Sequence, residues 1–323
     1  SNYVLKGNQW FGDNNYYKVR YNDGSSDVKA EIKLFGMNPD HFRDSDGHSF
    51  RLRFDAEQGF GDKKLNFLNP RSRDFITDPL LNIIYGKVYG GLKINYTPAR
   101  VVLNKSNYGI FYMEDFFDKY FIEQNRKRES LIFEISNDSL YFNHIGEDDS
   151  FLEIGSKLNL LYHNDYDSFI DKIDIDKIKA LIVLASVIND AHPLSDINMH
   201  WYYNNVTGLI EPTIREGFVK KLTSINIDKI VENNTIINDV YHKHIINSDF
   251  LYEMKSDLAL IKEIILNDEE YNNLKNTMIG FANKINEKEK VIIENIDLIS
   301  ELLQKEQKVK DNPELMDSYL EQE

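Results

Sequence analysis

The sequence contains no cysteine and no long apolar run, and each absence excludes a class of structure. Without cysteine among its 323 residues the chain can form no disulfide, no thiolate nucleophile and no cysteine-ligated zinc site. No apolar run approaches the roughly 18 residues that a membrane-spanning helix needs, so we expect no membrane span. The chain begins with Ser1, and no signal peptide is visible in it.

Positive charge is also scarce. The chain has 38 Lys and Arg residues against 53 Asp and Glu residues, which gives a net charge of −15. Such a surface repels phosphate backbones, so we do not expect it to bind nucleic acid. A basic protein substrate would suit the same surface. Nothing in the sequence indicates an oligomeric state.

Apolar and aromatic residues are plentiful, at 41% and 12% of the chain, which is typical of a folded globular protein. Short strand patterns dominate residues 1–113. Residues 114–217 hold a helix pattern over Glu114–Gln124, a strand pattern over Leu131–Ile135, apolar helices, a polar loop and a hairpin pattern. Residues 218–310 contain no proline, and their periodicity predicts three or four helices, as in the apolar stripe Met254, Leu258, Ile261 and Ile265. We therefore predict an α+β fold in three segments: 1–113, 114–217 and 218–323.

The predicted strand over residues 48–54 alternates strictly, with an apolar face (Phe50, Leu52 and Phe54) and a basic face formed by Arg51 and Arg53. A helix is predicted from Asp74 to Tyr89, where Asp78 is a candidate acid to pair with the basic strand. Two further expectations are a hairpin connection around Gly59 and Gly61, and a frayed acidic tail over residues 311–323.

The stretch from Asn189 to Gly217 organises the chain. An apolar helix over residues 177–188 ends abruptly at Asn189-Asp190, and a polar loop follows. A strand pattern over residues 199–203, a turn over 204–208 and a short second strand then lead to Ile214-Arg215-Glu216-Gly217. A kinase-type site presents its base and its metal ligands on a series of this kind: a helix, an acidic loop, a hairpin and an acid-Gly pair.

This stretch resembles the CotH family of spore-coat-type atypical protein kinases. The residues that carry the resemblance here are Asp190, His192, Asn198, Tyr202-Tyr203, Thr207 and Glu211-Pro212. The family's final metal-binding Asp falls on Glu216. Ser49–Phe54 resembles the family's basic strand, which carries a Lys, and Asn107–Glu114 resembles its Tyr-Gly strand that ends in Glu. The resemblance covers roughly residues 28 to 217.

The resemblance implies a bilobed, protein-kinase-like fold with a strand-rich small lobe and a helical large lobe. It implies transfer of the ATP γ-phosphate to Ser or Thr of a protein, and a location at a coat or cell surface. Asp190 is then the catalytic base, and Asn198 and Glu216 hold Mg²⁺ or Mn²⁺. Arg53, with Arg51, falls at the position of the cation that binds the nucleotide. Glu114 falls at a position whose role is either hinge or structural.

Each of these residues also has a structural interpretation. The two arginines can be surface residues of an edge strand, Asp190 can close a helix, and Asn198 can be a hydrogen-bonded loop residue. The aromatic run Trp201-Tyr202-Tyr203 can form a sugar or base platform, although core packing is commoner. A hydrolase with paired carboxylates also stays open. Because Arg53 and Glu216 replace Lys and Asp, the alternative function is a catalytically impaired pseudokinase or a coat scaffold on the same fold.

Overall fold

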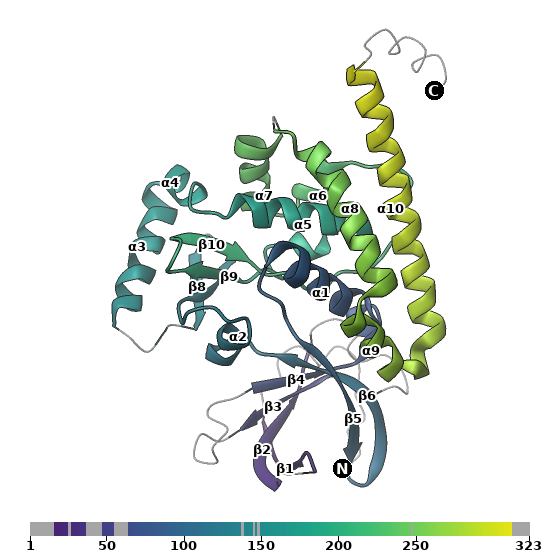
Figure 1. Ribbon diagram of the computed structural model, residues 1–323. Coiled ribbons are helices and arrows are strands. Elements are labelled where there is room, and N and C mark those ends of the chain that lie inside the picture. The colour runs from purple at the N-terminus through teal and green to yellow at the C-terminus, as the bar shows by residue number, and fades with distance from the viewer. Residues whose placement is uncertain are drawn as a thin grey trace, which may run out of the picture.

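A computed structural model describes residues 16–24, 27–36, 47–54, 64–136, 139–144, 146, 149–246 and 248–311. The described part combines helices with antiparallel sheets, which confirms the α+β class (Figure 1). The connection around Gly59 and Gly61 and the residues beyond Asp311 lie outside the described residues. Within the described part, no helix is both long enough and apolar enough to cross a membrane.

The first sheet is a six-stranded, curled antiparallel sheet at one end of the molecule (Figure 1). Its strands lie in the order β1-β2-β3-β4-β6-β5. Their bounds are β1 Tyr17–Asn22, β2 Asp27–Leu34, β3 Phe50–Phe54, β4 Lys64–Leu68, β5 Tyr96–Leu103 and β6 Ser106–Asp115. The predicted alternation of β3 is confirmed, because its three apolar side chains are buried in a small core with Leu65, Phe67 and Phe111. The two arginines of β3 lie on the opposite face.

A second sheet of four strands lies among the helices, in the order β10-β9-β7-β8. Its strands are β7 Ile132–Ser136, β8 Ser139–His144, β9 Trp201–Asn204 and β10 Leu209–Pro212. The predicted hairpin is therefore present as β9 and β10, and Gly208 ends its turn with φ +74°. The strand pattern over residues 131–135 is confirmed as β7, whereas β8 was not predicted because its polar residues give it a weak strand pattern.

The helices pack around one shared core. They are α1 Thr77–Tyr89, α2 Lys119–Gln124, α3 Ser150–Asn164, α4 Tyr166–Ile170, α5 Ile175–Ile188, α6 Ile227–Val231, α7 Thr235–Val240, α8 Phe250–Asn267, α9 Glu269–Thr277 and α10 Ala282–Asp311. A π-helical turn, Tyr241–Ile245, follows α7, and short 3₁₀ turns are Pro70–Arg73, His192–Leu194 and Ile279–Phe281. A single apolar cluster joins side chains of α1, α5, α8 and α10.

The predicted helical stripe of α8 is confirmed, since Met254, Leu258, Ile261 and Ile265 are all buried. The last helix, α10, runs along one side of the molecule from the six-stranded sheet to the opposite end (Figure 1). Five α-helices follow residue 217 in the described part of the chain, one or two more than the sequence predicted.

Two predicted helix starts were wrong. The helix expected from Asp74 begins at Thr77, because Asp74 and Phe75 take left-handed backbone angles of φ +46° and +63° that an α-helix excludes. The helix expected from Glu114 begins at Lys119, where the Asp118 side chain accepts the N–H groups of residues 120 and 121. Glu114 belongs to β6 instead.

Candidate functional site

The basic face of β3 directs its two arginines to different surroundings. Arg53 is paired with Lys64 across the sheet, whereas Arg51 is paired with Asn66, which lies next to Glu114 on β6. The Arg53 side chain is 47% exposed and forms a salt bridge with Glu31. Arg53, the sequence-predicted nucleotide cation, is therefore one row further from Glu114 than Arg51 is.

Arg51 is held in a defined position. Its guanidinium lies over the rings of Phe35 and Phe116, at 4.3 and 5.1 Å from their centroids. Its Nε donates a 2.7 Å hydrogen bond to Asn66 Oδ1, and Asn66 Nδ2 donates one of 3.0 Å to Glu114 Oε1. The structure therefore brings Arg51 and Glu114 together through Asn66.

Positive charge is concentrated on this face of the sheet, although the chain as a whole is acidic. Lys33 on β2, Arg51 and Arg53 on β3, and Lys64 on β4 lie in adjacent rows. Burial and repulsion from the three other cations lower the pKa of Lys33. Bringing an anion onto this face would relieve that repulsion, so the face is suited to a phosphate or carboxylate ligand.

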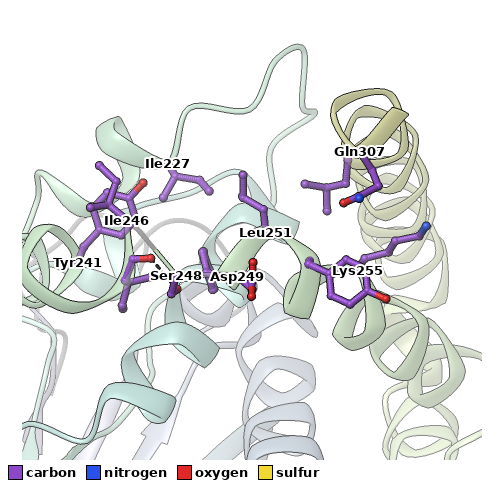
Figure 2. A pocket seen from close by; sticks show the side chains of 12 residues that line it. Ile227, Tyr241, Ile246, Ser248, Asp249, Leu251, Lys255 and Gln307 are labelled. Atoms are coloured by element: carbon purple, nitrogen blue, oxygen red, sulfur yellow. Dashed lines mark hydrogen bonds between the residues drawn. The ribbon is translucent and has the colours of Figure 1, made fainter. Parts of the chain in front are cut away.

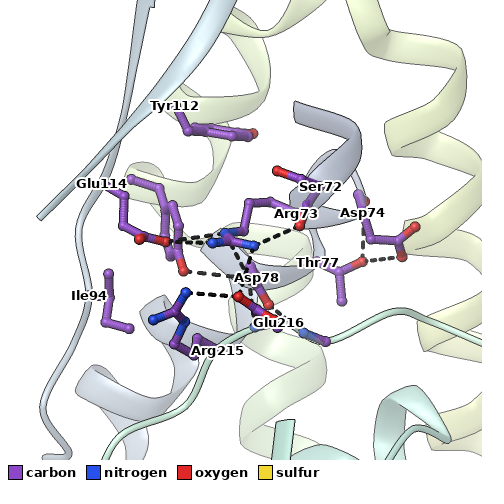
Figure 3. Close-up of polar contacts among 12 residues, drawn as sticks. Ser72, Arg73, Asp74, Thr77, Asp78, Ile94, Tyr112, Glu114, Arg215 and Glu216 are labelled. Atoms are coloured by element: carbon purple, nitrogen blue, oxygen red, sulfur yellow. Dashed lines mark hydrogen bonds and ion pairs between the residues drawn. The ribbon is translucent and has the colours of Figure 1, made fainter. Parts of the chain in front are cut away.

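Glu114 is the partner of a fully buried arginine (Figure 3). Its Oε2 lies 3.0 Å from Arg73 NH2, and each side chain is 1% exposed. Burial alone would raise the pKa of Glu114, but the nearby Arg73 and Arg215 more than offset this effect and lower it. Of the two roles left open for Glu114, these contacts describe a structural one.

Asp78 anchors the backbone of the acid-Gly pair. Its carboxylate accepts the N–H of Glu216 at 2.8 Å and that of Gly217 at 2.6 Å, and it lies 3.3 Å from Arg73 Nε. Burial raises its pKa to about 6. The expected partner of Asp78 was the basic strand; its partners are Arg73 and the 216–217 backbone instead, since α1 packs beside that segment (Figure 3).

Glu216 adopts a left-handed backbone conformation with φ +64°, which is uncommon for a residue with a side chain. Its carboxylate accepts a 2.8 Å hydrogen bond from Arg215 NH2. It also lies 3.6 Å from Arg73 NH1 and 3.8 Å from His192 Nε2. The Asp78 hydrogen bonds hold this strained residue in place, and strain of this kind is concentrated at functional sites.

Asp190 follows the end of α5. Asn189 closes the helix with φ +53°, and Asp190 donates its N–H to Ala185 O at 3.0 Å. The Asp190 side chain is 4% exposed; it accepts the N–H of Phe218 at 2.9 Å and the ammonium of Lys220 at 2.7 Å. Asp190 thus ties the end of α5 to the segment that follows Gly217.

Asn198 and Glu216, the two predicted metal ligands, both lie against His192. The amide Nδ2 of Asn198 donates to His192 O at 3.0 Å, so its Oδ1 is the side-chain atom with the chemistry of a metal ligand. Among the described residues, no group of three His, Cys, Asp or Glu side chains could hold a metal ion. The donor chemistry nevertheless fits Mg²⁺ or Mn²⁺, since an amide oxygen and a carboxylate are hard ligands and Mg²⁺ commonly keeps several waters.

The aromatic run of β9 is part of the core rather than a binding platform. Trp201 and Tyr202 are each 1% exposed, and the Tyr202 hydroxyl donates to Arg128 O at 2.7 Å. Core packing, the commoner alternative, therefore describes these two residues.

Sequence reasoning missed Arg73, Arg215 and Lys220. Arginine and lysine are exposed by default, and nothing in a loop such as Asn69-Pro70-Arg71-Ser72-Arg73 signals that one of its arginines is buried. The only available signal was the density of charge just before α1. Lys220 pairs with Asp190, 30 residues away, and Arg73 contacts Glu216, 143 residues away, whereas Arg215 pairs with the adjacent Glu216.

A separate cavity of about 230 Å³ lies among the start of α6, the π-helical turn after α7, α8 and α10 (Figure 2). Its lining is part apolar, with Ile227, Leu251 and Leu303, and part polar, with Ser248, Asp249 and Lys255. None of the sequence-predicted site residues lines it. It is therefore distinct from the cluster described above.

No protein-family model matches the sequence, and no curated protein matches it either.

Proposed function

We propose that this chain is an ATP- and metal-dependent atypical protein kinase that acts on Ser or Thr and is similar to the CotH family. The proposal includes a kinase-like, bilobed arrangement, with the six-stranded sheet in the small lobe and the shared helical core in the large lobe. A protein substrate of basic character would complement the net charge of −15.

One observation carries the proposal: an unbroken series of contacts joins the basic sheet face to the loop after α5. It runs from Arg51 through Asn66 to Glu114, then through Arg73 to Glu216, and from Glu216 to His192. His192 in turn contacts Asp190 and Asn198. Three segments, β3, the loop over residues 190–198 and the segment of Glu216, thus supply the groups to which the proposal gives the roles of cation, base and oxygen ligands.

Each group has a chemical role in phosphoryl transfer. Arg51, with the neighbouring cations, binds the phosphates of ATP. Asp190 accepts the proton of the substrate hydroxyl as its oxygen bonds to the γ-phosphorus, and the bond from that phosphorus to the bridging oxygen breaks to release ADP. Asn198 and Glu216 would hold the divalent cation, which neutralises phosphate charge when it is bound.

The experiment is transfer of labelled phosphate from ATP, first with Mg²⁺ and then with Mn²⁺, onto the protein itself and onto a generic basic substrate. We expect incorporation that disappears in Asp190→Ala. No incorporation with either metal, together with no ATP-induced thermal shift, would refute a nucleotide-dependent function.

A paired comparison tests the site on the sheet. Arg51→Met should weaken ATP binding by about tenfold or more, because a charge-assisted contact to phosphate is lost. Arg53→Met should weaken it less, because Arg53 is further from Glu114 and already pairs with Glu31. Arg20→Met, at an exposed ion pair on β1, is the control.

A specific observation also favours the second candidate, a nucleotide-binding pseudokinase or scaffold. The carboxylates of Asp190 and Glu216 are both paired with cations of the protein itself, Lys220 and Arg215. Glu216 is also one methylene longer than the Asp that Mg²⁺ geometry would favour. A thermal shift with ATP but no phosphate transfer would select this function.

A further inference from the structure

Lys220 forms a contact with Asp190 that the proposed mechanism does not yet use. Its ammonium lies 2.7 Å from Asp190 Oδ1. The Lys220 side chain is 62% exposed, whereas that of Asp190 is 4% exposed. A solvated cation therefore covers the oxygen of a buried carboxylate.

The backbone of Lys220 is fixed on both sides although its side chain is exposed. Its N–H donates to Ile188 O at 2.9 Å, at the end of α5. Asn295 on α10 donates to Lys220 O at 2.9 Å and accepts the N–H of Leu222 at 2.8 Å. The backbone of Lys220 is thus fixed beside Asp190, while its flexible, solvent-exposed side chain brings the ammonium to the Asp190 carboxylate.

The ion pair contributes less to stability than a fully buried one would, because water screens the exposed ammonium. The contact also occupies Oδ1 of the residue that must accept a proton. An ammonium on a flexible stem can leave this oxygen when a more highly charged anion arrives. The γ-phosphate of ATP is such an anion, and it must approach Asp190 for transfer to occur.

We propose that Lys220 binds the transferring γ-phosphate, and this inference rests on the proposed kinase function. The ammonium moves from Asp190 Oδ1 to the non-bridging oxygens of the γ-phosphate, which frees Oδ1 for the substrate hydroxyl. During transfer the hydroxyl proton goes to Asp190, the new oxygen–phosphorus bond forms, and ADP takes the electron pair of the broken bond. Lys220 keeps its proton throughout.

Binding of two nucleotides tests this role without requiring turnover. The probes are ADP and the β,γ-imido analogue of ATP, each titrated with Mg²⁺ into the full-length protein. Lys220→Met should weaken binding of the ATP analogue by about tenfold and leave ADP binding unchanged, because only the analogue carries a γ-phosphate. Lys220→Arg keeps the charge and should restore most of the difference.

Lys221→Met is the matched control, since Lys221 is the adjacent exposed lysine. It should change neither affinity. Equal losses for both nucleotides, or no loss for either, in Lys220→Met would overturn the role of Lys220 while the proposed function stands. A wild-type protein that binds neither nucleotide would overturn the proposed function, and the role of Lys220 with it.

Turnover gives a second readout that a structural role would not produce. In a protein with measurable transfer, Lys220→Met should lower kcat more than it raises the KM of the protein substrate. Cooperative thermal unfolding of the variant confirms that it is folded.

Discussion

The Arg73 guanidinium and the Glu114 carboxylate form an ion pair at 3.0 Å in which each side chain is only 1% exposed. The pair joins the 3₁₀ turn before α1 to the end of β6. Charges this deeply buried are stable only when they are paired, so the two residues depend on each other.

Glu114→Gln should lower the free energy of unfolding by about 3 kcal/mol, because it leaves the buried Arg73 with less compensating charge. Glutamine keeps an acceptor for Asn66, so the measured loss reports mainly the charge. Denaturant unfolding measures the effect. Glu31→Gln, which removes the partner of the exposed Arg53, is the control and should cost less than about 1 kcal/mol. Similar small losses for both variants would show that Arg73 is not held by Glu114.

The buried Asp78 should make stability depend on pH. Its pKa is raised from 3.8 to about 6 in the folded protein, so the folded state binds the proton more tightly than the unfolded chain does. The contribution of Asp78 to stability is therefore fully present below about pH 4 and is lost as pH rises to about 6. A pKa shift of this size corresponds to a contribution of up to about 3 kcal/mol to the free energy of unfolding.

The measurement is the free energy of unfolding of wild type minus that of Asp78→Asn, which cannot ionise, at several values between pH 4 and pH 7. The difference should fall as pH rises through this window. A constant difference, or one that increases with pH, would mean that Arg73 and the backbone N–H groups keep the Asp78 carboxyl ionised.

Asn295 should be a major link between α10 and the candidate site. Its amide donates to Val187 O and Lys220 O and accepts the N–H of Leu222, all within 2.9 Å. Asn295→Ala leaves these buried groups without partners and should cost about 3 kcal/mol. Hydrogen exchange at the Leu222 amide should become faster. Asn286→Ala, at an exposed position of the same helix, should change stability by less than about 0.5 kcal/mol.

The close packing of Gly217 gives a last prediction. A Cβ at this position would lie 2.8 Å from the terminal methyl groups of both Ile188 and Leu81. Gly217→Ala should therefore cost about 1–3 kcal/mol and displace Glu216. Gly280→Ala, where a Cβ meets no atom within 4 Å, should be neutral or slightly stabilising. Thermal unfolding of the two variants side by side checks the difference, and equal effects would contradict the packing argument.

The sequence by itself determined the features that local periodicity encodes. The two faces of β3, the buried stripe of α8 and the order of α5, polar loop and β-hairpin all followed from the spacing of apolar residues and turn residues. Element ends were less accurate, as at Asp74 and Glu114, because they depend on backbone angles and caps that weak local preferences do not fix.

Only the tertiary structure decided which charges meet. Asp78 reaches the N–H of Gly217 across 139 residues, and Arg73 reaches Glu114 across 41. With 38 basic and 53 acidic residues in the chain, composition allows almost any pairing. Burial selects a few of them, because a charge removed from water must find a partner in three dimensions. The strand register puts Arg51 rather than Arg53 in the row beside Glu114. Only the fold brings Lys220 to Asp190, so the sequence did not predict Lys220 at all.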